Sequence, residues 1–180
     1  SYIEINNVVN NLEMDETYKS DVGCWGIIGA IWADTSNKYV NDTIKMYSIN
    51  SNIKIPYKGN EIGSAIGYAS NKSIGEYKFN NVKSKLFINE GWGVGGIVGQ
   101  FQPECTEKIT LENFEVEVSQ EVDEYYKYLD ELGGVIGYLS SYQNETGKVI
   151  IKHGKTTMNI NCAEYAGGII GYHQGHNLDV

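Results

Sequence analysis

Acidic side chains are dense between Glu112 and Glu131, and they are the first candidates for chemistry in this sequence. Two carboxylates held a few ångströms apart, with the pKa of one of them raised, could cleave a glycosidic bond. However, Glu115 and Glu117 alternate with the apolar residues of segment 114–118, which places them on the outward face of a strand. The chain contains no arginine, and its carboxylates are scattered. The pattern therefore favours a solvated surface, with a polysaccharide-acting β-helix enzyme as the alternative.

Histidines near the end of the sequence are candidates for a metal site. His173 and His176 lie close to Asp179, and two imidazoles on a strand or loop could bind one ion. No third ligand of comparable quality is evident in the sequence, so we predict neither a metal nor a cofactor. His153 stands beside Gly154 and is expected to be a solvated loop residue.

The cysteines and a glycine-rich segment carry no cofactor signal. Cys24, Cys105 and Cys162 are odd in number and lack C-x-x-C spacing, so neither a zinc ribbon nor a closed disulfide framework follows. We expect them to be small buried hydrophobic residues. Segment 91–96 formally matches a dinucleotide-binding fingerprint, but that motif needs a following helix, and a strand pattern follows here. A glycine-rich corner is the favoured interpretation.

Three tyrosines occupy one position of an internal repeat, directly after its closing glycine. They are Tyr68, Tyr138 and Tyr172, and the other copies have Ala30 and Gln100 there. Aligned tyrosines could form an aromatic ladder that stacks on sugars or on a neighbouring filament. They could equally stack inside the core, and both interpretations stay open.

Three sequons, beginning at Asn41, Asn71 and Asn144, have the N-x-[ST] pattern of glycosylation acceptors. Such a count is weak in an Asn-rich chain. All three nevertheless fall in polar segments that we expect to be loops, where a glycan could project freely. We therefore predict glycosylation at these residues if the source glycosylates its secreted proteins.

The repeat that positions these residues is a short block in which two central residues, mostly apolar, precede a closing glycine. Five copies are present, and their closing glycines are 38, 32, 38 and 34 residues apart. Five copies at similar spacing are the signature of a stacked architecture. The blocks close at Gly29, Gly67, Gly99, Gly137 and Gly171.

Short segments that alternate apolar and polar residues follow each of the first four blocks, as in 44–46 and 53–55 of the first repeat. Each repeat thus holds about three short strands, which cannot enclose a core alone but can when copies stack. We predict an all-β, right-handed parallel β-solenoid (β-helix) of about five coils, with residues 1–180 forming one domain of a larger protein. We expect glycine to supply unusual φ values and close approach at tight corners.

The blocks resemble the GLUG repeat, in which a Gly-apolar-apolar-Gly core precedes a polar turn and an alternating strand. The resemblance runs from about Gly23 to Tyr172, although Ile or Val stands where the name has leucine and Ser64 replaces one opening glycine. It implies a repeat of large secreted or surface-anchored adhesins and filaments, and it carries no catalytic residues to this chain.

Charge and composition limit the classes of partner that the chain could bind. The net charge of −9 disfavours nucleic acid and anionic headgroups, and no apolar run approaches the ~20 residues of a membrane span. We therefore expect an extracellular or cell-surface structural or adhesive module without enzymatic activity, and possible partners include carbohydrate. Neither end of the array resembles a cap, so we expect adjoining coils or self-association to cover the ends.

Overall fold

The computed structural model describes residues 2–15, 23–32, 43–71, 76–103, 108–121, 129–140 and 148–174. Strands account for the regular structure of these residues, and no helix long and apolar enough to cross a membrane occurs among them. Five long strands are β1 (Tyr2–Glu13), β3 (Thr43–Lys58), β5 (Glu76–Gly95), β7 (Lys108–Ser119) and β10 (Lys148–Asn159). Five short strands are β2 (Ile28–Trp32), β4 (Ile66–Asn71), β6 (Val98–Pro103), β9 (Ile136–Ser140) and β12 (Ile170–Gln174).

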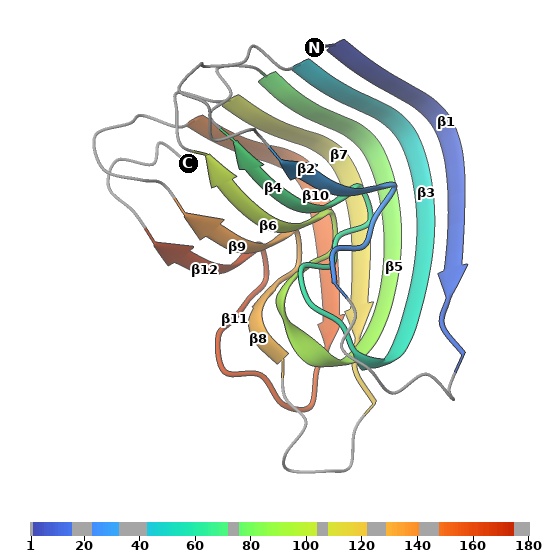
Figure 1. Ribbon diagram of the computed structural model, residues 1–180, viewed down its shortest axis with the longest axis vertical. Coiled ribbons are helices and arrows are strands. Elements are labelled where there is room, and N and C mark those ends of the chain that lie inside the picture. Colours follow the sequence, from blue (N-terminus) through green and yellow to red (C-terminus); the bar gives the residue numbers. More distant parts are fainter. Residues whose placement is uncertain are drawn as a thin grey trace.

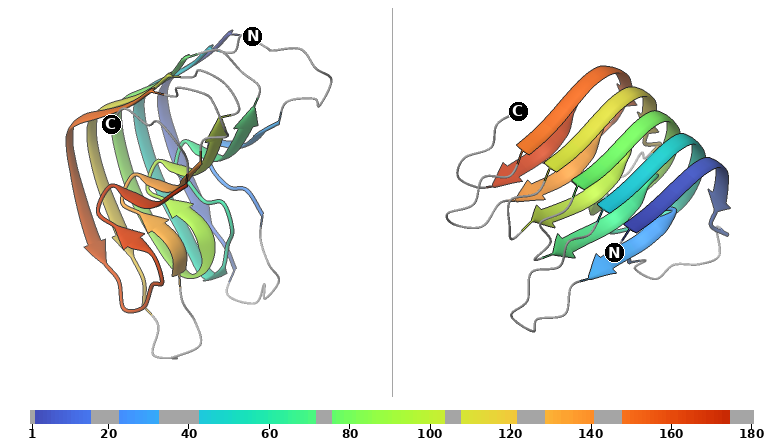
Figure 2. Two further views of the ribbon diagram at one scale, coloured as in Figure 1. Left: turned by 90° about the vertical axis from the view of Figure 1, so that its left-hand side faces the viewer. Right: turned by 90° about the horizontal axis from the view of Figure 1, so that it is seen from above.

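All strand pairs are parallel, and each strand pairs with its equivalent in the next repeat. The long strands follow the order β1-β3-β5-β7-β10, and the short strands form a second sheet in the order β2-β4-β6-β9-β12. Figures 1 and 2 show that the strands of both sheets are stacked along one axis, with the long strands running from β1 at one end to β10 at the other. This arrangement confirms the predicted all-β parallel solenoid.

Regular strand pairing on a third side of the coil is confined to the middle and C-terminal part of the described stack. It consists of the C-terminal part of β5 paired with β8 (Leu129–Gly133), which pairs in turn with β11 (Ala166–Gly167). Isolated bridges from Trp25 to Ile62 and from Ile62 to Val94 continue the column toward the N-terminal coils. The described stack therefore has about three complete three-sided turns, fewer than the five coils predicted from the five repeats.

Each long strand is one bent element, so the prediction of two separate short strands in this part of each repeat is wrong. Segments 44–46 and 53–55 both belong to β3. The bend falls at a residue with positive φ, such as Asn81 with φ 58°, and equivalent residues of all five long strands share this conformation. Because the left-handed residue shifts the alternation by one, the inward positions change from 77 and 79 to 82, 84, 86 and 88. The column of corner residues is Asn7, Ser48, Asn81, Asn113 and His153.

Asparagine suits this corner because it tolerates the left-handed region better than most residues. Its side chain also connects coils, since Asn81 Nδ2 donates a hydrogen bond to Ser48 Oγ at 3.2 Å. His153, which was expected in a loop, lies instead at this corner within β10, although it is exposed as predicted.

The closing glycines stack in one column, as the repeat predicts. A Cβ on Gly67 would lie 2.5 Å from the Trp25 nitrogen, and a Cβ on Gly99 would lie 2.5 Å from the Gly67 oxygen. None of the five closing glycines has a positive φ. Close approach of backbones, rather than unusual φ, is therefore what requires glycine here.

The core fills the space between the two sheets with apolar side chains from equivalent positions of successive coils. Tyr77 from β5 meets Phe101 from β6 edge to face, with ring centroids 5.4 Å apart and planes at 76°. Such burial supplies most of the stability of the stack. Side chains that are less than 2% exposed include Tyr77, Phe79, Ile44, Met46, Ile49, Ile53, Ile55, Ile62, Ile66, Leu86, Ile88 and Ile97.

Candidate functional site: two facing columns

The predicted tyrosine positions form one column on the short-strand sheet. Strand register aligns Ala30 with Tyr68, Tyr68 with Gln100, Gln100 with Tyr138, and Tyr138 with Tyr172. We call these five residues the tyrosine column. Gln100 interrupts it, so Tyr68 has no ring directly beside it in the column.

The C-terminal half of the column holds the aromatic surface. The rings of Tyr138 and Tyr172 stack with centroids 5.5 Å apart and planes 8° from parallel. The Tyr138 hydroxyl donates a hydrogen bond to Gln174 Oε1 at 2.8 Å, and both rings are half-buried. Tyr68, by contrast, is only 9% exposed. Tyr68 is thus covered although it does not belong to the hydrophobic core cluster, whereas the other two rings stay partly open to contact.

A second column faces the first from the third side of the coil. On that side, backbone pairing aligns Trp25, Ile62, Val94, Leu132 and Ala166 from coil to coil. The residue directly before each of them in the sequence belongs to the second column, which therefore consists of Cys24, Glu61, Gly93, Glu131 and Tyr165. We call it the acidic column. The two columns approach each other closely in two places. A Cβ added to Gly93 would lie 3.7 Å from Gln100 Oε1, and the ring centroids of Tyr165 and Tyr172 are 5.1 Å apart.

Glu131 has the most perturbed carboxyl among the described residues. Burial raises its pKa from the usual 4.5 to about 7, and the neighbouring Asp130 charge adds to the effect. Its Oε2 is buried and accepts no hydrogen bond. A carboxyl group with such a pKa exchanges its proton near neutral pH, which is the property that a general acid needs.

The other carboxylate of the acidic column is poorly placed as a partner for Glu131. Glu61 lies two coil steps away, about 9.6 Å along the stack, at the far end of the spacing that an inverting pair uses. The Cys24 thiol donates a hydrogen bond to Glu61 Oε2 at 2.6 Å. Burial and this hydrogen bond raise the pKa of Cys24 to about 11, so the thiol is protonated and a poor nucleophile at neutral pH.

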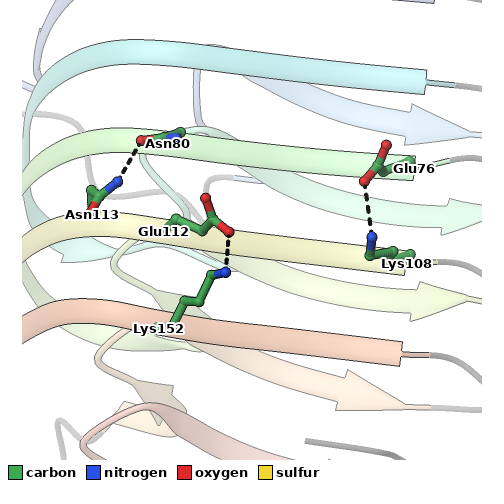
Figure 3. Close-up of polar contacts among 6 residues, drawn as sticks. All are labelled: Glu76, Asn80, Lys108, Glu112, Asn113 and Lys152. Carbon is green, nitrogen blue, oxygen red and sulfur yellow. Dashed lines mark hydrogen bonds and ion pairs between the residues drawn. The ribbon is translucent and has the colours of Figure 1, made fainter.

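The outward face of the long-strand sheet pairs its charges from coil to coil (Figure 3). Glu76 lies 3.5 Å from Lys108, and Glu112 lies 2.8 Å from Lys152. The hydrogen bond from Lys152 lowers the pKa of Glu112. Farther along the strands, Lys85 pairs with Glu117 at 3.3 Å and Lys54 with Glu13 at 2.8 Å.

A shallow depression of about 490 Å³ lies over this sheet, lined in part by Lys83, Lys85, Glu115, Glu117 and Lys155. Glu115 and Glu117 are exposed, as their alternation predicts. Charges alternate in sign here, because Glu115 stands between Lys83 and Lys155 in the register. The acidic residues of strand β7 therefore lie beside lysines of the neighbouring strands.

The remaining candidates are placed as follows. Segment 91–96 ends β5 and is followed by strand β6 instead of a helix, which confirms the glycine-rich corner. Cys24 and Cys162 are free and half-buried, and Cys105 lies outside the described residues. His173 lies in β12 and is largely exposed, and its partial burial lowers its pKa. His176 and Asp179 lie outside the described residues. No group of three metal-binding side chains is found in the described part of the chain.

The sequons are only partly described. Asn71 is the last residue of strand β4, so this sequon starts at a strand end instead of within a loop. Asn41 and Asn144 lie outside the described residues.

Sequence reasoning missed two features. The corner column could have been found from the asparagines that recur inside the strand patterns, at 6–7, 80–81 and 113. The perturbed Glu131 could not, because its environment arises only when the third side of the coil closes. Comparisons with protein-family models, curated proteins and solved structures find no match for this chain.

Proposed function

We propose that this chain is a non-catalytic structural or adhesive module of an extracellular or cell-surface protein or filament, of the kind that GLUG repeats supply. The observation that carries the proposal is the coil-to-coil pairing of charges on the outward face, as in Glu76 with Lys108 and Glu112 with Lys152 (Figure 3). Individual exposed pairs contribute little stability, but several of them spread over the sheet favour one register over others. Such a surface supports a role in holding a stack together.

The test of the non-catalytic role uses the purified chain and a panel of acidic and neutral polysaccharides. We expect no new reducing or unsaturated ends above the level of heat-denatured protein. Release of such ends, if reduced at least tenfold by Glu131→Gln or Glu61→Gln, would contradict the proposal and favour the β-helix enzyme. Glu115→Gln serves as the matched control, because that carboxylate lies on the outward sheet away from the facing columns.

A glycan-binding module is the second candidate, and the stacked, half-buried rings of Tyr138 and Tyr172 favour it. Aromatic faces bind the apolar faces of sugar rings. A glycan array followed by titration calorimetry tests this function. Binding that Tyr172→Ala abolishes and Tyr2→Ala leaves unchanged would support it, because Tyr2 is exposed at the other end of the stack.

The extracellular location rests on the sequons and on the resemblance. If the native source glycosylates its secreted proteins, mass spectrometry of protein from that source should find glycans at Asn41, Asn71 and Asn144. Three unmodified asparagines in a source that glycosylates secreted proteins would count against a secretory route.

A further inference from the structure

Both ends of the described stack present strand edges and apolar side chains. At the N-terminal end, β1 and β2 pair on one side only, and Tyr2, Ile3 and Val9 are 60%, 41% and 68% exposed. At the C-terminal end, β10 and β12 likewise pair on one side, and Ile169 is 38% exposed. Figure 2 shows these two ends on opposite sides of the stack. Such edges are templates for pairing with another strand.

We propose that a second copy of this chain stacks head to tail on the first, with β1 of one copy pairing with β10 of the other in the register that the coils already use. The inference deepens the proposed structural role and rests on it, because it names the partner that would extend the stack.

The two ends match in length and conformation. Strands β1 and β10 each have 12 residues, and β2 and β12 each have 5. Continuing the register places Lys148 opposite Tyr2 and Asn159 opposite Glu13. The corner residues then coincide, because Asn7 and His153 share a φ of 56°. Two edges that bend at the same place can form a continuous ladder along their whole length.

The two ends also match in shape. A depression of about 440 Å³ opens at the C-terminal end and is lined in part by Phe114, Ile151, Gly154, Ile169 and Ile170. The Phe114 ring reaches over Gly154, to within 2.0 Å of the position that a Cβ there would take, and so contributes an apolar surface to this depression. In the continued register, the residue opposite Gly154 is Val8, and Ile5 lies opposite Ile151. An inward-facing valine would thus enter the apolar depression.

The charges of the two ends are opposite. Strand β1 contains two glutamates and no lysine, whereas β10 contains three lysines and no acidic residue. In the continued register, Glu4 lies opposite Ile150, with Lys148 and Lys152 at the diagonal positions. Opposite charges at these positions stabilise a strand pair, and like charges destabilise it. Head-to-tail contact is therefore favoured over contact between two equal ends.

The register itself supplies a sharp test at Val9, whose side chain is exposed and would face Lys155 of the second copy. Within one chain, Val9 lies opposite the uncharged Asn50, so either charge is tolerated there. The measurement is sedimentation velocity of the whole chain over a range of concentrations at low salt. We expect reversible, concentration-dependent association. We also expect about fivefold tighter association for Val9→Glu than for Val9→Lys, since cross-strand charge pairs differ by about that factor.

The two variants remove the same apolar side chain, so nonspecific hydrophobic aggregation would affect them equally. Val9→Lys should be rescued by Lys155→Glu, and high salt should reduce the difference between the variants. Circular dichroism and thermal unfolding check that each variant is folded. A chain that stays monomeric at all concentrations, or equal behaviour of Val9→Glu and Val9→Lys, would overturn the head-to-tail contact. A monomer without hydrolytic activity would still leave the structural role intact.

Discussion

Glu131 shows how burial at a single residue links this fold to pH. Its folded pKa of about 7 lies above the usual 4.5, so the folded protein binds this proton more tightly than the unfolded chain does. The resulting stabilisation is fully present below the unfolded pKa and is lost as the pH rises through about 7. Above that pH the folded protein carries a partly buried charge that the unfolded chain hydrates freely.

The substitution Glu131→Gln should therefore stabilise the protein at alkaline pH and have little effect in mild acid. We expect a gain of about 1 kcal/mol in the free energy of unfolding, after discounting the shift for the solvent that reaches this carboxyl. Urea denaturation of both proteins across the pH range measures the difference. A gain that is the same at every pH would mean that the pKa of Glu131 is not raised in the folded state.

The closing glycines give a second prediction for single residues. A Cβ on Gly99 would lie 2.5 Å from a backbone oxygen of the neighbouring coil, which cannot move without disturbing the stack. Gly99→Ala should cost about 3 kcal/mol of unfolding free energy, the upper part of the range for overpacking. Gly23→Ala is the matched control, because a Cβ there meets nothing within 4 Å. Equal effects of the two substitutions in chemical denaturation would show that the column is not tightly packed.

At the scale of the strand, the left-handed corner decides which side chains face inward. Asn81→Val should destabilise the protein by about 2 kcal/mol, because a β-branched residue is strained at positive φ. Asn81→Gly should change stability by less, since it loses the hydrogen bond to Ser48 but avoids the strain. Thermal unfolding of the two variants measures the order of stability. A valine variant as stable as the glycine variant would contradict the corner geometry.

The sequence predicted the strands from alternation but misjudged their extent. Alternation in 77–79 and again in 86–88 predicts two separate strands with a boundary between them. The structure shows that this boundary is one left-handed residue inside a continuous strand. Alternation records which face a residue occupies, but it does not distinguish a bend from an end. The repeated asparagine is the signal that separates the two cases.

For the whole molecule, the recurrence of the glycine blocks was sufficient to predict a parallel stack. Equivalent positions of a repeat must superpose for strand pairing to continue, so spacing alone implied the columns. The sequence could not predict that the tyrosine column and the acidic column face each other, because this depends on how the third side packs against the short-strand sheet. The exposed parts of Tyr138 and Tyr172 likewise depend on their place near the end of the stack.

If the five repeats form one stack in a single register, the distance between the two ends of the stack is fixed. Asn11 and Thr157 are exposed and share one column, four coil steps apart. Spin labels at these positions, attached after the native cysteines are replaced by serine, can be measured by pulsed electron spin resonance in a sample diluted with unlabelled chain. We expect a narrow distribution centred at about 19 Å between backbones, which is four steps of ~4.8 Å, broadened only by the label linkers. A broad distribution, or one centred well beyond that distance, would contradict the continuous stack.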